Sequence, residues 1–85
     1  MTKDEITRIK KVLCSEIYDK YINSALYDRT HKQEYADKYI MHNHTEQVIE
    51  HILFILGIDN LNFISDIERK IIANSAEIQA EAIEE

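Results

Sequence analysis

Apolar residues recur every three or four positions through most of this 85-residue chain, a spacing typical of helices. Proline is absent, and the one glycine, Gly57, follows the most apolar run, residues 48–56. Without proline nothing forces a helix to break, and a glycine just past a helical stretch is a preferred left-handed cap. The pattern therefore predicts an all-α fold, a compact bundle of three to four helices with a long C-terminal helix, formed by residues 1–85 as a single domain.

The first helix is predicted to begin at Thr2, because Thr2 and Glu5 have the spacing of a capping box. It should run to about Leu26 or Tyr27, and polar residues 27–30 then predict a turn. Its apolar face carries residues at helical spacing: Ile6, Ile9, Leu13, Ile17 and Tyr21. The one cysteine, Cys14, lies beside this face and is expected to be a buried, unreactive thiol.

A short, peripheral second helix is predicted from His31 to about Met41, with Thr30 and Gln33 in capping positions. Residues 42–45 are polar and predict a junction. The third predicted helix, residues 48–56, is apolar over more than half its circumference and should be central. With Gly57 just past its end, Ile58 falls where a Schellman motif places a contact to Leu53.

The last predicted helix has two candidate starts, one capped by Asp59 or Asn60 and one by the Ser65 and Glu68 capping box. Its apolar stripe consists of Leu61, Ile64, Ile67, Ile71 and Ile78. The spacing approaches a heptad with Asn74 at a seam position, where a polar residue can fix the register of paired helices. The stripe fits an intramolecular bundle equally well. Residues 75–85 are predicted to form a fraying, acidic helix end.

Charge is unevenly distributed, since residues 1–40 carry a net +1 and residues 41–85 a net −7, for a total of −6. Such a surface repels phosphate backbones and attracts basic proteins. Direct nucleic-acid binding and a membrane partner are therefore not expected. No run approaches the ~20 apolar residues of a membrane span, so we expect a cytoplasmic, soluble protein.

Candidate catalytic and metal-binding chemistry is sparse. His42, His44 and His51 lie within ten residues, but His44 and His51 are about 10.5 Å apart along one helix, too far to share an ion. The chain has no Glu-x-x-His or His-Glu-x-x-His motif. We therefore predict no enzyme activity, no cofactor and no metal site.

Tyr35 and Tyr39 are one helical turn apart and are candidate anchors for a partner, although they could simply cover the next helix. The predicted partner-binding residues are these two tyrosines and four C-terminal glutamates: Tyr35, Tyr39, Glu77, Glu81, Glu84 and Glu85.

The class we expect is a small non-enzymatic interaction protein, regulatory or inhibitory, able to form a homodimer. Its acidic surface would bind and occlude a basic protein partner, such as a nucleic-acid-handling protein, as phage-type inhibitors of defence nucleases would. The alternative is a small self-associating DNA-binding transcriptional regulator that uses the basic first helix.

Overall fold

The computed structural model describes residues 2–58 and 63–84, and within them it contains helices and no strand. Three long helices account for most of these residues: α1 (Lys3–Thr30), α2 (Gln33–Ile55) and α4 (Asp66–Glu84). The all-α prediction is confirmed for this part of the chain. The predicted cap at Asp59 or Asn60, together with Leu61, lies outside the described residues.

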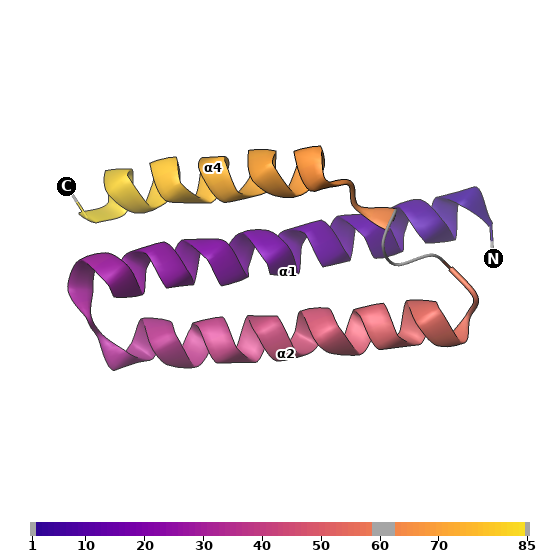
Figure 1. The fold of residues 1–85 in the computed structure, drawn as a ribbon, viewed down its shortest axis with the longest axis horizontal. Coiled ribbons are helices and arrows are strands. Elements are labelled where there is room, and N and C mark those ends of the chain that lie inside the picture. The colour runs from indigo at the N-terminus through magenta and orange to yellow at the C-terminus, as the bar shows by residue number, and fades with distance from the viewer. Residues whose placement is uncertain (1, 59–62, 85) are drawn as a thin grey trace.

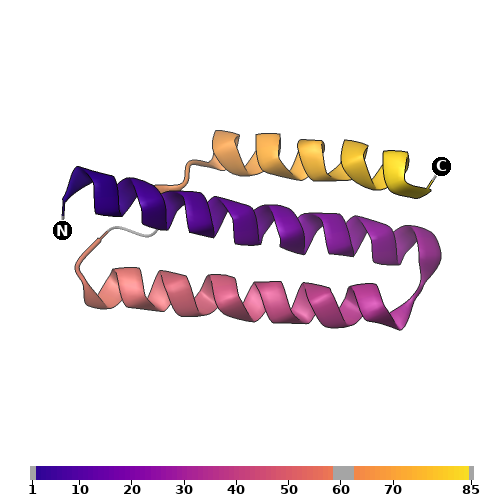
Figure 2. The ribbon, with the colours of Figure 1, turned by 180° about the vertical axis from the view of Figure 1, so that it is seen from behind.

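The helices form an elongated bundle in which α1 occupies the middle (Figures 1 and 2). α2 returns antiparallel to α1, and α4 lies along α1 in the same direction (Figure 1). The Cα atoms span 43 × 22 × 19 Å. α1 packs against both other helices and buries residues on more than one face: Leu13, Ile17, Asn23, Ala25 and Leu26. The prediction that residues 48–56 form the central helix is therefore wrong.

The first helix begins as predicted, because Glu5 N–H donates to Thr2 Oγ1 at 3.2 Å and Thr2 N–H donates to Glu5 Oε1 at 3.1 Å. It does not end in a turn at residues 27–30. Thr30 Oγ1 instead donates to the Leu26 carbonyl oxygen at 2.8 Å, and the chain reverses at His31 in the left-handed region, with φ of 56°. The predicted Thr30–Gln33 cap is not formed, since Lys32 caps α2 without a side-chain hydrogen bond.

α2 is one continuous helix, so the predicted junction at residues 42–45 is wrong. Two of the polar residues there, His42 and Thr45, have hydrogen-bond partners in the folded chain. His42 Nδ1 lies 2.6 Å from Glu16 Oε2 of α1, and Thr45 Oγ1 donates to the Met41 carbonyl oxygen at 3.1 Å. Their polarity reflects contacts of a long helix rather than a break in it.

The C-terminus of α2 is the predicted Schellman motif. Ile58 N–H donates to the Leu53 carbonyl oxygen at 2.9 Å, and Gly57 N–H donates to the Phe54 carbonyl oxygen at 3.0 Å. Gly57 adopts the required positive φ of 78°. Ile58 packs against the cluster that contains Leu53.

α4 begins after the Ser65 capping box, in which Glu68 N–H donates to Ser65 Oγ at 3.1 Å and Ser65 N–H donates to Glu68 Oε1 at 3.4 Å. The helix turns a different face inward from the one its apolar stripe indicated. Ala76 and Ala80 are fully buried, whereas most of the isoleucine stripe lies outside.

Buried apolar side chains form two clusters along α1. The larger consists of Leu13, Ile17, Leu53 and Ile64, and the smaller of Ala25, Leu26 and Ala80. In the smaller cluster α1 and α4 contribute small side chains, Ala25 and Ala80, beside Leu26. The bundle is therefore held together by a short core and by polar contacts between helices.

Candidate interaction surfaces

An apolar groove lies between the N-terminal half of α1 and the C-terminal half of α2. It has a volume of about 270 Å³, and its lining consists of Arg8, Ile9, Val12, Ile49, Ile52 and Leu53. Leu53 is 1% exposed and belongs to the core, whereas Val12 and Ile52 are 53% and 49% exposed. The groove therefore offers an apolar surface to solvent.

The α2 side of the groove continues beyond its lining. Val48 lies four residues before Ile52 and Ile55 three residues after it, so both share its helix face, and both are exposed. Arg8 is the charged residue of the lining. The sequence indicated this surface only through the apolar excess of residues 48–56, because the α1 side of the groove depends on a helix pairing that no local pattern gives.

A second apolar surface runs along the outside of α4. We call Ile67, Ile71, Asn74 and Ile78 the isoleucine row. Its three isoleucines are 71%, 59% and 67% exposed, and Asn74 is exposed as well. The row lies about 200° around the helix from Ala76 and Ala80, which pack inward. Of the predicted stripe, Ile67, Ile71 and Ile78 therefore face solvent, whereas Ile64 is buried in the larger core cluster.

The two predicted tyrosine anchors differ in placement. Tyr35 is half-buried against the Ala25 and Leu26 cluster, and Lys38 Nζ lies 5.8 Å from the centre of its ring. Tyr39 is 36% exposed and helps line a second apolar hollow of about 360 Å³, between α1 and the first half of α2. The structure therefore places Tyr39 on the surface and Tyr35 largely in the packing between the helices.

The predicted acidic set is partly neutralised within the chain. Arg29 Nη2 of α1 donates to Glu77 Oε1 and to Glu81 Oε1, each at 3.1 Å. Glu85 and the side chain of Glu84 lie outside the described residues. The positive charge of Arg29 thus offsets one of the two negative charges of Glu77 and Glu81. The negative potential expected at the C-terminal end of α4 is weaker as a result.

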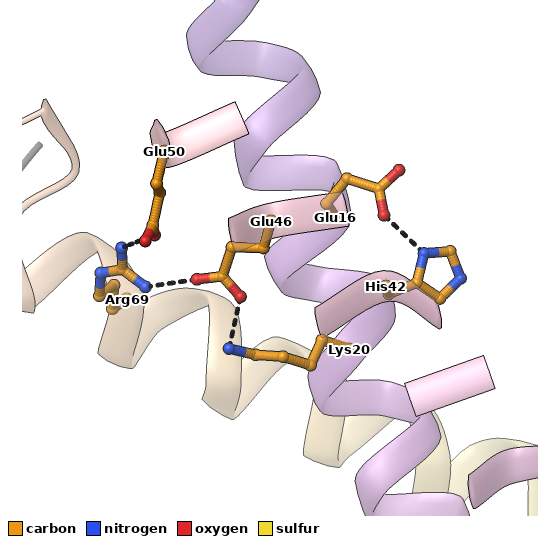
Figure 3. Close-up of polar contacts among 6 residues, drawn as sticks. All are labelled: Glu16, Lys20, His42, Glu46, Glu50 and Arg69. Atoms are coloured by element: carbon orange, nitrogen blue, oxygen red, sulfur yellow. Dashed lines mark hydrogen bonds and ion pairs between the residues drawn. The ribbon is translucent and has the colours of Figure 1, made fainter. Parts of the chain in front are cut away.

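A polar cluster joins all three helices and was not anticipated (Figure 3). Glu46 of α2 is 5% exposed and lies between Lys20 of α1, whose Nζ is 2.5 Å from Oε2, and Arg69 of α4, whose Nη1 is 3.1 Å from Oε1. Arg69 also reaches Glu50, with Nη2 3.2 Å from Oε1. Two cations and two carboxylates thereby fix the position of α2 relative to α1 and α4.

The charge of Glu46 is maintained by its partners. Burial raises the pKa of the Glu46 carboxyl, but hydrogen bonds and charge from Lys20 and Arg69 outweigh burial and hold that pKa below its usual value. For Arg69, burial lowers the pKa of the guanidinium. Hydrogen bonds and charge from Glu46 and Glu50 outweigh this effect, so the Arg69 pKa is raised above its usual value. Glu46 and Arg69 are therefore charged at neutral pH, and their ion pairs hold the three helices together.

The remaining candidate chemical groups are dispersed. His42 pairs with Glu16, whereas His44 and His51 are exposed. Within residues 2–58 and 63–84 no three histidine, cysteine or acidic side chains converge as a metal site would require. Burial and the nearby Glu68 raise the pKa of the Cys14 thiol, which disfavours the reactive thiolate.

The basic residues of the first helix are partly engaged. Lys10 Nζ lies 3.0 Å from Glu68 Oε2 of α4, and this contact, with the Ser65 backbone, lowers the pKa of Glu68. Lys3 and Lys11 are exposed. In the described part of the chain no helix combines the length and apolar character needed to cross a membrane.

Comparison of the chain with protein-family models, with curated proteins and with solved structures gives no match. The surfaces themselves are therefore the basis for a functional proposal.

Proposed function

We propose that this chain is a small non-enzymatic interaction protein, regulatory or inhibitory, that binds a helical segment of another protein in the apolar groove between α1 and α2. The observation that carries the proposal is the exposure of Val12 and Ile52 above the buried Leu53. Apolar grooves between helices receive the apolar face of an amphipathic helix, through side chains one turn apart.

The titratable side chains support an interaction role. Many of their contacts join one helix to another: Lys20 to Glu46, Arg69 to Glu46 and Glu50, Arg29 to Glu77 and Glu81, Lys10 to Glu68, and His42 to Glu16. They organise the bundle and leave the groove apolar except for Arg8. Such a surface can supply contact area and shape, which is what a binding partner needs.

Net charge contributes in a different way. At −6 the chain attracts a basic partner, for example a nucleic-acid-handling protein that would be occluded when bound. Because Arg29 partly neutralises Glu77 and Glu81, we assign the affinity to the groove and the steering to the overall charge. Steering of this kind changes the association rate more than the stability of the complex.

The test is affinity capture from a lysate of the source cells, with the wild type compared with Val12→Glu/Ile52→Glu. Each substitution replaces an exposed side chain, so folding should survive, as circular dichroism would verify. Proteins retained by the wild type and lost by the groove variant would support the proposal. Equal retention by both proteins would refute it.

Two control variants separate the other interpretations. Glu77→Gln/Glu81→Gln should slow association at low salt and leave the captured set unchanged. Lys10→Ala/Lys11→Ala tests the DNA-binding alternative, which predicts nuclease-sensitive retention of DNA that this variant loses. Capture of DNA alone would favour that regulator over the interaction protein.

A further inference from the structure

The isoleucine row of α4 has no partner in the described part of the chain. Ile67, Ile71 and Ile78 are each more than half exposed, while the opposite face of the helix packs on α1 through Ala76 and Ala80. The row is separate from the apolar groove, which α1 and α2 line. An inference about the row therefore does not depend on the proposed function.

The spacing of the row is that of a helix-pairing seam. Its members follow one another at four, three and four residues, the a/d alternation of a heptad repeat. Such a row presents a straight apolar strip that another helix with the same spacing can match. The strip is uncharged, so two chains that each carry −6 can approach along it.

Asn74 points to the identity of that second helix. A carboxamide both donates and accepts hydrogen bonds, so one asparagine satisfies another. A second copy of this chain provides an identical exposed amide at the same place in an identical row. We propose that two copies of this chain pair through their isoleucine rows, α4 against α4 and antiparallel, about a two-fold axis near Asn74.

The register follows from the heptad positions. When Ile71 lies opposite Asn74 of the second copy, Ile67 lies opposite Ile78 of that copy, and symmetry repeats both contacts. The two Asn74 side chains then occupy adjacent layers on the same side of the seam, within reach of each other. All three isoleucines are covered in this arrangement.

Flanking charges favour the antiparallel direction. Lys70 and Glu77 are seven residues apart and border the row on the same side. In the antiparallel register Lys70 lies beside Glu77 of the second copy, twice by symmetry, whereas parallel pairing would place Lys70 beside Ser75 and Glu77 beside Ala82. Lys70 is exposed and makes no ion pair with other described residues. Glu77 is 56% exposed despite its contact with Arg29.

The size of the seam sets the strength of the dimer. One face of a single helix provides less than the roughly 800 Å² per partner of a standard stable interface. The dimer should therefore be weak, with monomer and dimer exchanging as the protein concentration changes.

Sedimentation equilibrium of the full chain from micromolar to millimolar concentration tests the proposal. The mass should rise from one chain to two, and Ile71→Glu should remain one chain throughout. Phe54→Glu is the matched control, because Phe54 is also an exposed apolar residue, 72% exposed against 59% for Ile71, but lies on α2. A monomer at every concentration, a mass above two chains, or dimer loss in Phe54→Glu with retention in Ile71→Glu would overturn the proposal.

A charge exchange tests the direction. Lys70→Glu and Glu77→Lys should each weaken the dimer about three- to tenfold at low salt, because each turns two attractive contacts into repulsions. The double variant restores the pairs with signs exchanged and should return to near the wild-type constant. Single variants without effect, or a double variant weaker than either single one, would overturn the antiparallel register.

Discussion

Lys20 of α1 places its ammonium nitrogen 2.5 Å from the carboxylate of Glu46, a residue of α2 that is 5% exposed. Arg69 of α4 donates a hydrogen bond to the same carboxylate. One buried side chain of α2 therefore binds both other helices (Figure 3). A bundle with a small apolar core thus takes its helix positions in part from charge. This arrangement favours one packing because any other leaves a buried charge without its partner.

Glu46→Ala should lower the free energy of unfolding by about 3–5 kcal/mol, the usual cost of removing one member of a buried ion pair. By the per-residue rule the whole chain has roughly 4–13 kcal/mol, so this loss is a large part of it. Urea unfolding followed by circular dichroism measures the difference. Glu34→Ala, at an exposed glutamate of the same helix, should change stability by less than ~0.5 kcal/mol.

The double variant Lys20→Met/Glu46→Leu removes both charges of the pair. It therefore separates the energetic effect of losing the ion pair from the cost of leaving Lys20 buried without a partner. It should recover most of the stability lost in Glu46→Ala, because apolar side chains of similar volume commonly replace a buried ion pair at little cost. Both variants also lose the contact of Arg69 with Glu46, so a double variant as unstable as Glu46→Ala would assign the loss to Arg69 rather than to an unpaired Lys20.

Acid should destabilise the fold through its shifted carboxylates. The pKa of Glu46 lies below the ordinary 4.5 in the folded chain, because Lys20 and Arg69 outweigh burial, and the Glu68 pKa is lowered by Lys10 and the Ser65 backbone. A lowered folded pKa stabilises the native state above the unfolded pKa, and that contribution is lost as pH falls through the folded one. Urea midpoints should therefore be flat from pH 7 to about 5 and fall below about 4.5.

Glu46→Gln provides the comparison for this pH profile. It lacks the carboxylate, so its stability should start lower at pH 7 and fall less between pH 5 and 3 than that of the wild type. An identical drop in the two proteins would show that other groups carry the acid sensitivity.

The two left-handed residues should respond differently to substitution. His31 has φ of 56° and Gly57 has φ of 78°, a region that costs a side chain about 1–2 kcal/mol. Gly57→Ala should therefore destabilise by about 1 kcal/mol through the backbone alone, since an added Cβ meets no atom within 4 Å. Gly57→Asn should cost less, because asparagine tolerates this conformation.

At His31 the strain is already present. His31→Gly should be nearly neutral, because relief of the backbone offsets loss of the edge contact with Tyr27, whose ring centre is 5.7 Å away. His31→Val should destabilise by at least ~1 kcal/mol, since a β-branched residue resists positive φ. Thermal unfolding of both variants checks the order, and a more stable valine variant would contradict it.

The face of α4 that packs inward can be checked with adjacent substitutions. Ile78→Ala removes an exposed side chain and should change stability by less than ~0.5 kcal/mol at concentrations where the chain is monomeric. Ala80→Leu enlarges a fully buried alanine against Ala25 and should cost about 1–3 kcal/mol by overpacking. The opposite order would mean that the isoleucines, and not the alanines, face α1.

Local signals predicted three of the helix ends correctly, whereas the predicted Thr30 and Gln33 cap is not formed. The Thr2 and Ser65 boxes and the Gly57 motif depend on side chains within a few residues of each other, so the sequence contains the whole interaction. The turn predicted at residues 27–30 was placed too early, because the left-handed residue at the actual end of α1 is His31 and neither glycine nor proline marks that position. The break predicted at residues 42–45 is absent because His42 contacts Glu16 of α1 and Thr45 bonds to the Met41 carbonyl within α2, contacts that a local polar pattern does not reveal.

The packing of α4 could not be obtained from hydrophobicity. Of the five isoleucines of α4, Ile67, Ile71, Ile78 and Ile83 are exposed and only Ile72 packs against the core, whereas the small Ala76 and Ala80 are fully buried. Of the candidate surface, the sequence contained the isoleucine row and its asparagine in full. The apolar groove needed the pairing of Ile9 and Val12 with Ile49 and Ile52, residues some forty positions apart.

The alanine contact between α1 and α4 also governs how the molecule opens. Burying the methyl group of Ala80 removes less apolar surface from water than burying Leu13 or Ile64 in the larger cluster. The turns of α4 near Ala80 are therefore bound to α1 more weakly than the turns near Ile72. Detachment should therefore start at the C-terminus and travel toward Ser65. Amide protons of the last turns of α4 will exchange with deuterium first, those beside Ile72 later, and those around Ile17 in α1 last.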